Sequence, residues 1–143
     1  MMASIAIFQD GKMLIAQRSE HEQFLSGYWT GIGGKVEDSD QDLEAAARRE
    51  AKEETNLDVE VIMPIVIEEF TREDKPGIKA INVVYLCKDG NSSEIKLSPE
   101  HRAYRWIDRE ELHKIEKMTD FAKKNLDKIF DQYLKIKNNQ LVD

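Results

Sequence analysis

The amino-acid sequence predicts one α+β domain that spans residues 1–143. The first observation is the order of its patterns: strand-length apolar runs, one helical segment, further strand-length runs, and two helical segments near the carboxyl end. The second is composition, because 143 residues with 41% hydrophobic side chains suffice for one hydrophobic core. No internal repeat or linker divides the chain.

Two strand-length apolar runs begin the chain, "SIAIF" at 4–8 and "MLIAQR" at 13–18. The segment "QDGK" between them contains the Asp10–Gly11 pair, which is typical of a two-residue β-hairpin turn. We therefore predict an amino-terminal hairpin. A glycine-rich loop is predicted to follow at 31–34.

The next segment has the pattern of a helix over residues 43–55. The alanines at 45–47 are strong helix formers, and either Ser39 or Asp40 is expected as the N-cap. Asn56 follows the last periodic residue, and asparagine is the best residue after glycine for the left-handed position that ends a helix.

Two longer runs rich in valine and isoleucine, at 59–70 and 78–88, predict two further strands separated by a polar loop at 71–77. "YRWI" at 104–107 predicts a short strand.

Two helices are predicted after these strands. Asp108 is expected to begin the first, with Glu111 completing a capping box, and the second is expected over about 119–136. The second has an apolar face at spacings of three and four: Ala122, Leu126, Ile129, Phe130, Tyr133 and Leu134. It is therefore predicted to dock on a sheet, while the polar tail at 135–143 is expected to fray.

The charge of the chain limits its partners. A net charge of −7 provides no broad basic field, so neither nucleic acid nor an anionic membrane is expected as a partner. The single cysteine, Cys87, has no second cysteine with which to pair, which is compatible with a reducing compartment. The first residues, "MMASIAIF", lack a positive leader region and a long apolar run. We expect a cytoplasmic protein that is a monomer or a homodimer.

Three carboxylates are concentrated near the end of the predicted helix. Glu50, Glu53 and Glu54 are spaced i, i+3 and i+4, so they project from one face. Repulsion between Glu50 and Glu54 costs roughly 0.2–0.5 kcal/mol in an isolated helix, and acids near a carboxyl end also oppose the helix dipole. A hard cation, Mg²⁺ or Mn²⁺, would offset both penalties, because the available ligands are all oxygen.

The acidic helix by itself also fits an ordinary solvated face, since Arg49 can pair with Glu53 at i, i+4. The glycine-rich segment favours the metal interpretation. Gly31, Gly33 and Gly34 allow the backbone to approach a ligand closely, and they lead directly into the acidic helix.

These residues together resemble the signature of the Nudix hydrolases, the MutT-like pyrophosphohydrolases. Gly34 matches the first glycine of the signature, Arg49–Glu50 its Arg-Glu pair, Glu53–Glu54 its Glu-Glu pair and Leu57 its last aliphatic residue. The matching segment covers residues 34–57, about a sixth of the chain.

The sequence departs from the signature at three places. The segment between the glycine and the Arg-Glu pair is one residue longer, so the first glutamate of the signature maps either to Asp40 or to Gln41. Ala51 replaces a larger aliphatic residue, and Asn56 replaces the final glycine.

The resemblance implies an α/β/α sandwich around a central mixed β-sheet. It also implies metal-dependent hydrolysis of the pyrophosphate bond of a small-molecule nucleotide, a nucleoside diphosphate linked to another group. A nucleoside triphosphate is the first expectation, and another derivative such as a nucleotide sugar is the alternative. Glu50, Glu53, Glu54 and the Gly34 carbonyl are the implied ligands of Mg²⁺ or Mn²⁺. Arg49 would orient the acids.

The general base has three candidates. In this family it is often placed on a loop a few residues before a Trp-containing strand, which here indicates Glu100, six residues before Trp106. His101 is a rival because histidine titrates near neutrality. Glu53 is the third, since some members use a glutamate of the signature.

The substrate contacts inferred from the same comparison are Arg18, Trp29, Thr30, Gly33 and Lys35. Thr30 stands where members that hydrolyse oxidised purine triphosphates carry an asparagine, so a purine is only weakly indicated. Aromatic residues in this region, Trp29 included, fit the protein core as well as a base-stacking role.

Two other classes of function are compatible with the same resemblance. A Nudix-fold module that only binds nucleotide would be expected to have lost the acids, and all three are present. A nucleotide-sensing regulator would be expected to carry a basic DNA-binding helix pair, and the sequence shows none.

Overall fold

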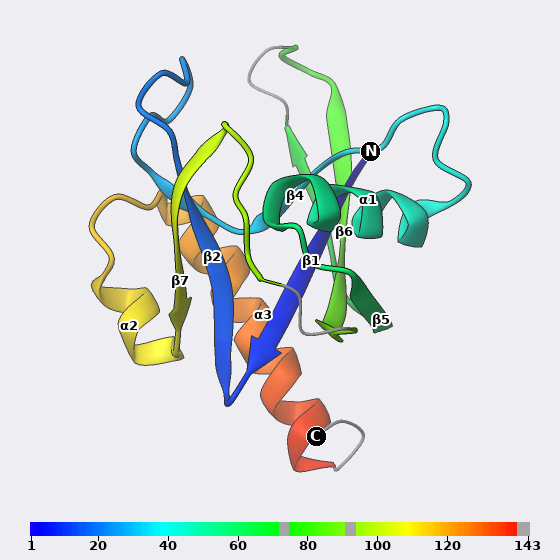
Figure 1. The fold of residues 1–143 in the computed structure, drawn as a ribbon, viewed down its shortest axis with the longest axis vertical. Coiled ribbons are helices and arrows are strands. Elements are labelled where there is room, and N and C mark those ends of the chain that lie inside the picture. Colours follow the sequence, from blue (N-terminus) through cyan, green and yellow to red (C-terminus); the bar gives the residue numbers. More distant parts are fainter. Residues whose placement is uncertain (72–74, 91–93, 140–143) are drawn as a thin grey trace.

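A computed structural model describes residues 1–71, 75–90 and 94–139 (Figure 1). The elements are β1 (Met2–Gln9), β2 (Lys12–Arg18), β3 (Trp29–Thr30), β4 (Ile32–Lys35), α1 (Leu43–Thr55), β5 (Val59–Thr71), β6 (Lys79–Asp89), β7 (His101–Ile107), α2 (Arg109–Lys114) and α3 (Asp120–Asn138). Within the described residues, no helix has the length and apolar character needed to cross a membrane.

The strands form the mixed sheet that the sequence predicts. β1 is central: it pairs in parallel with β6 and antiparallel with β2 and β4, while β5 pairs with β6 and β7 with β2. The predicted β1–β2 hairpin is confirmed. Asp10 and Gly11 both have positive φ, at 53° and 77°, as a two-residue turn between twisted strands requires.

The glycine-rich loop predicted at 31–34 is wrong. Residues 32–35 form β4, which lies antiparallel to β1 with Ser4 opposite Gly33. Glycine usually disfavours strands, but here the lack of side chains allows close packing on both faces of β4. A Cβ on Gly33 would lie 2.3 Å from Ser4 Oγ, and one on Gly34 would lie 2.4 Å from the Glu50 carboxyl carbon.

Helix α1 has the predicted bounds, and Asn56 takes the predicted left-handed conformation with φ 68°. The predicted N-cap is wrong, because Asp42 performs this role by accepting a hydrogen bond from the Ala45 amide. Asp40 is engaged elsewhere: its carboxylate accepts from Arg49 and from the Glu37 amide. The additional residue in this segment therefore leaves a second aspartate to cap the helix.

The carboxyl-terminal helices also follow the predictions at their amino ends. Asp108 and Glu111 form the capping box of α2, and Thr119 caps α3. The apolar face of α3 is buried at Leu126, Ile129, Phe130 and Tyr133, but Leu134 is 40% exposed, contrary to the prediction. Helix α3 continues to Asn138, slightly beyond the predicted end at about residue 136, and residues 140–143 of the tail lie outside the described residues.

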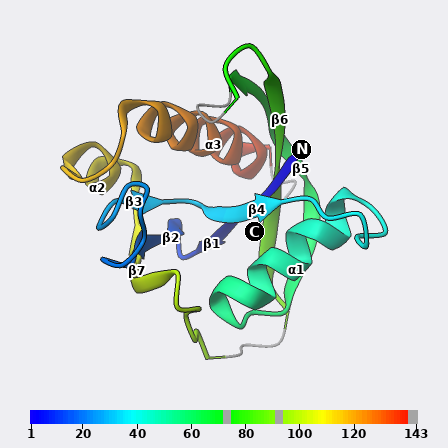
Figure 2. The same ribbon diagram turned by 90° about the horizontal axis from the view of Figure 1, so that it is seen from above.

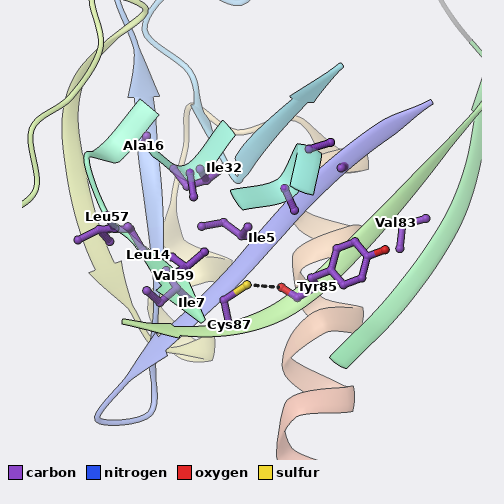
Figure 3. Packing of buried hydrophobic residues seen from close by; sticks show 14 residues of the cluster. Ile5, Ile7, Leu14, Ala16, Ile32, Leu57, Val59, Val83, Tyr85 and Cys87 are labelled. Atoms are coloured by element: carbon purple, nitrogen blue, oxygen red, sulfur yellow. Dashed lines mark hydrogen bonds between the residues drawn. The ribbon is translucent and has the colours of Figure 1, made fainter. Parts of the chain in front are cut away.

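Helices α1 and α3 cover opposite faces of the sheet, as Figure 2 shows. Alternate residues of β1 serve the two layers, since Ile5 and Ile7 pack with the α1 alanines and Ala6 packs beneath α3. Figure 3 shows the α1 layer, in which Cys87 is enclosed with its thiol against the Tyr85 carbonyl. Burial raises the pKa of Cys87 to about 12, which makes this thiol unreactive.

Candidate active site

Strand β4 lies between the α1 layer and the α3 layer. Because Gly33 has no side chain, Ser4 approaches it closely on the α3 side, and because Gly34 has none, the Glu50 carboxylate approaches it closely on the α1 side. The Gly33 amide also donates a 3.3 Å hydrogen bond to Glu54 Oε2. The two glycines therefore bring backbone groups into contact with the acidic face of α1.

Two of the three acids are enclosed at this contact. Glu54 is only 6% exposed, and the Glu50 side chain is 12% exposed. Burial, supported by the nearby negative charge of Glu50, raises the pKa of Glu54 to about 8. Burial also raises the pKa of Glu50, although Arg49 opposes that shift. Two carboxylates held together out of water form a site that would gain from a bound cation.

Arg49 connects the acids to the loop before α1. Its Nε and Nη2 donate to the two Asp40 oxygens at 2.8 and 2.9 Å, and Nη2 also donates to the Lys35 carbonyl at 3.0 Å. Its Nη1 donates to Glu50 Oε1 at 3.0 Å and to Glu53 Oε2 at 3.1 Å. Arg49 therefore joins the Glu50 and Glu53 carboxylates to Asp40 and to the Lys35 carbonyl of β4.

The contacts of Arg49 distinguish between Asp40 and Gln41, the two residues to which the first glutamate of the signature maps. Asp40, not Gln41, makes the two-pronged pair with the arginine. The Arg49 guanidinium lowers the pKa of Asp40 to about 2, so this carboxylate is ionised throughout the physiological range.

Glu53 differs from the other two acids because its side chain is 58% exposed and faces solvent beside Arg49. Within the part of the chain that the structure describes, no group of three carboxylate, imidazole or thiolate side chains is already arranged to hold an ion. The donor set nevertheless fits a hard cation: it consists of oxygens, and Glu54 is desolvated and repelled by Glu50.

Glu100 lies near this acidic group. Its loop is fastened to the end of α1, where the Ser98 amide donates to the Glu54 carbonyl, and to β2, where the Ser19 amide donates to the Glu100 carbonyl. The negative charge of Glu100 also contributes to the raised pKa of Glu54, after burial and the charge of Glu50.

The rival base His101 is placed differently. It is 6% exposed, and its Nδ1 is buried with no hydrogen-bond partner among residues 1–71, 75–90 and 94–139. Burial lowers the pKa of His101, and its charged neighbours are Glu100, Arg18 and Glu22. The position of His101 therefore favours a role in the packing around the Glu100 loop.

A cavity of about 360 Å³ lies on the other side of β4, beneath the amino-terminal end of α3. Arg18, Trp29, Thr30 and Gly33 line it, whereas Lys35 is exposed at the end of β4 and does not. The structure therefore brings together four of the five predicted substrate contacts.

The side chains of Arg18 and Trp29 are both engaged within the protein. Arg18 Nε donates to the Phe24 carbonyl at 2.8 Å. Arg105 stacks over the Trp29 ring at 5.5 Å.

Other lining residues come from elements that the sequence did not connect to the site. Glu68 on β5, Asn82 on β6 and Phe121 on α3 line the same cavity. A signal for the first two was present in the sequence: each is a polar residue among the otherwise apolar inward-facing positions of its strand.

The fold and the site together define a class of protein. It is an α/β/α sandwich in which the acidic face of α1, held by Arg49, contacts the glycines of β4 beside a cavity. The chain belongs to the NUDIX domain family, because the model of that family matches residues 2–129. Comparison with solved structures supports the same fold. A MutT protein from Methanosarcina mazei Go1 has a TM-score of 0.74 at 24% identity, covering 94% of each chain.

Relatives with assigned activities share part of this sequence. The asymmetrical bis(5'-nucleosyl)-tetraphosphatase of Mus musculus is 40% identical over 93 residues, which are 59% of this chain and 58% of the relative. The Sus scrofa enzyme of the same name is 32% identical over 101 residues, 65% and 64% of the two chains. This chain thus spans about three fifths of the length of these relatives. A C. elegans Ap4A hydrolase binary complex has a TM-score of 0.60 at 25% identity, covering 80% and 85% of the two chains.

Proposed function

We propose that this protein hydrolyses a phosphoanhydride bond in a nucleotide that contains a nucleoside diphosphate linked to another group. The observation that carries the proposal is the burial of Glu50 and Glu54 against the backbone of Gly33 and Gly34. Carboxylates in this environment are unfavourable in a protein that does not bind a cation, and they suit one that holds Mg²⁺ or Mn²⁺ against phosphate groups.

Glu50, Glu53, Glu54 and the Gly34 carbonyl are the proposed ligands. A cation held there would neutralise the charge that develops on the phosphate oxygens during the reaction. Arg49 supports this set of ligands, because its Nη1 donates to Glu50 Oε1 at 3.0 Å and to Glu53 Oε2 at 3.1 Å. Its pair with Asp40 prevents the guanidinium from turning away, so the carboxylates keep their orientation when substrate binds.

Glu100 is the proposed general base. A water molecule would transfer a proton to the Glu100 carboxylate while its oxygen forms a bond to phosphorus, and the bridging P–O bond would break as the second phosphate leaves. The support is the closeness of Glu100 to Glu54 and the hydrogen bonds that fasten its loop to α1 and β2. Glu53 is the alternative base, because its exposed carboxylate is accessible to water.

Two substrate classes are favoured by different observations. The curated relatives favour a bis(5'-nucleosyl) tetraphosphate, which asymmetric hydrolysis would convert to a nucleoside triphosphate and a monophosphate. The signature favours a nucleoside triphosphate, which would give a monophosphate and pyrophosphate. We place the tetraphosphate first because the sequence identity to those relatives is higher than to the structural neighbours of the MutT type. Cytoplasmic location and a monomeric or homodimeric state stay predictions.

The test is turnover of both substrates by the purified protein with Mg²⁺ or Mn²⁺, with products separated by anion-exchange chromatography. We expect one of the two product pairs above, and none in excess EDTA. Glu53→Gln should abolish turnover with the fold intact. A wild-type protein that binds these nucleotides with the metal present but releases no product would instead be a binding module.

A further inference from the structure

Three polar side chains form a hydrogen-bonded chain on the wall of the cavity beneath α3. Ser4 Oγ donates to Asn82 Oδ1 at 2.9 Å, and Asn82 Nδ2 donates to Glu68 Oε1 at 3.1 Å. The sheet register aligns them, since Glu68 lies directly opposite Asn82 and β1 is the next strand. All three line the cavity, whose remaining wall is largely apolar.

The chain of hydrogen bonds ends on an acceptor without a donor. Glu68 Oε2 is buried and has no hydrogen-bond partner among the described residues. An unsatisfied buried acceptor destabilises a folded protein, and one in a binding cavity is explained if the ligand supplies the donor. Asn82 occupies the other oxygen and thereby fixes the plane of the carboxylate.

Aromatic side chains next to Glu68 provide a surface for a flat ligand. Phe70, two residues further along β5, and Phe121 on α3 both line the cavity, with ring centroids 6.3 Å apart. Phe121 is 56% exposed, so its ring is accessible to a ligand, whereas one face of Trp29 is occupied by Arg105. A nucleobase stacked on such a ring presents its polar edge to the wall of the cavity.

We propose that Glu68 is a specificity-determining residue that accepts hydrogen bonds from a guanine base. Guanine presents two adjacent donors, N1–H and the 2-amino group, and Glu68 can accept both, because Oε2 has no donor and Oε1 keeps a second lone pair beside Asn82. Adenine and cytosine place a ring nitrogen acceptor beside their amino group, and uracil flanks its single N–H with two carbonyls, so each would set a lone pair against the carboxylate.

The location of the cavity is compatible with this role. Gly33 lines the cavity and its amide contacts Glu54, so the base site and the acidic site share the wall formed by β4. A base held at Glu68 would direct its phosphates past Gly33 toward the carboxylates. The inference rests on the proposed function, because it takes the ligand to be a nucleotide.

Binding of nucleoside monophosphates in Mg²⁺ tests the inference without turnover, because GMP, IMP and AMP contain no pyrophosphate bond. Titration calorimetry should show GMP binding at least tenfold more tightly than AMP, with IMP between them because it lacks the 2-amino group. Glu68→Gln must keep its carbonyl toward Asn82 and so presents an amide donor to the base. We expect it to weaken GMP binding by about 10- to 100-fold and to change AMP binding less than about twofold.

The matched control is Glu69→Gln, because Glu69 is an exposed neighbour paired with Lys79 and does not line the cavity. It should bind all three monophosphates like the wild type. If Glu68→Gln does not fold, Glu68→Asp, which withdraws the carboxylate but keeps its charge, should also lower the GMP:AMP affinity ratio.

Two outcomes would overturn the inference: equal affinity of the wild type for GMP and AMP, or an equal loss for both in the Glu68 variants, which would indicate contact with ribose or phosphate. Failure of the proposed function is distinguishable from either. A protein that shows no turnover but loses its GMP preference on Glu68→Gln would retain the base site and lack the hydrolytic activity.

Discussion

Replacing Glu54 by glutamine should stabilise the metal-free protein while abolishing its activity. Burial and the Glu50 charge raise the pKa of Glu54 from 4.5 to about 8. A carboxyl whose folded pKa exceeds its unfolded pKa stabilises the protein fully below the unfolded value, and that contribution is lost as pH rises through the folded value. The metal-free protein should therefore lose stability between pH 4.5 and 8.

The magnitude follows from the two pKa values. Ionisation favours the unfolded state by about 1.4 kcal/mol per pH unit within this window, which amounts to about 3 kcal/mol at pH 7. Glutamine cannot ionise, and its carbonyl can still accept from the Gly33 amide. Glu54→Gln should thus raise the free energy of unfolding at pH 7 by about 3 kcal/mol, or the Tm by about 10 °C for a chain of this length.

Thermal unfolding in EDTA, followed by circular dichroism at pH 4 and pH 7, measures the effect. The stabilisation should appear at pH 7 and nearly vanish at pH 4, where the wild-type carboxyl is protonated in both states. The control is Glu53→Gln, whose exposed side chain should alter stability by less than about 1 kcal/mol. Equal stability of Glu54→Gln and wild type at pH 7 would refute the reasoning.

Three further predictions concern the same site. Gly34→Ala places a Cβ within 2.4–2.6 Å of the Glu50 carboxylate and should weaken Mn²⁺ binding at least tenfold in a titration, whereas Gly31→Ala, which meets only Leu126 at 3.5 Å, should bind like the wild type. Glu100→Gln should lower kcat by roughly 10² to 10⁴ with little change in Mn²⁺ affinity, and near wild-type kcat would move the base to Glu53 or His101. The apparent affinity for Mg²⁺ should increase from pH 6 to pH 8, because Glu54 must lose its proton to bind the ion. If calorimetry shows that the Mg²⁺ affinity does not depend on pH, Glu54 is not a ligand.

Local sequence patterns predicted the turns and helix ends that depend on residues close together in the sequence. The Asp10–Gly11 turn, the alanine-rich α1 with Asn56 at its end, and the capping box of α2 each depend on residues within a few positions of one another. In the same way, the i, i+3, i+4 spacing of the acids predicted a shared helix face. Their different exposure was not predictable, because it depends on how closely β4 approaches α1.

The remaining differences have tertiary causes. β4 was predicted as a loop because glycine has low strand propensity, and its pairing with β1 and its contact with Glu50 override that propensity. Ser4, Asn82 and Glu68 were not predicted as part of the cavity, because Ser4 and Asn82 are 78 positions apart and the parallel β1–β6 pairing joins them. The sequence shows these polar residues, but only the fold shows that they lie together on one wall of the cavity.

The proposed function requires that the acids of α1 hold a cation that supports phosphoanhydride hydrolysis. The most direct measurement is initial rate against Mg²⁺ concentration, starting from EDTA-treated protein, with a bis(5'-nucleosyl) tetraphosphate and a nucleoside triphosphate as substrates. We predict no product without the ion, saturable activity in the millimolar range, and no activity at any Mg²⁺ concentration for a Glu53→Gln variant with wild-type circular dichroism. Activity that persists in EDTA, or that Glu53→Gln leaves unchanged, would contradict the account.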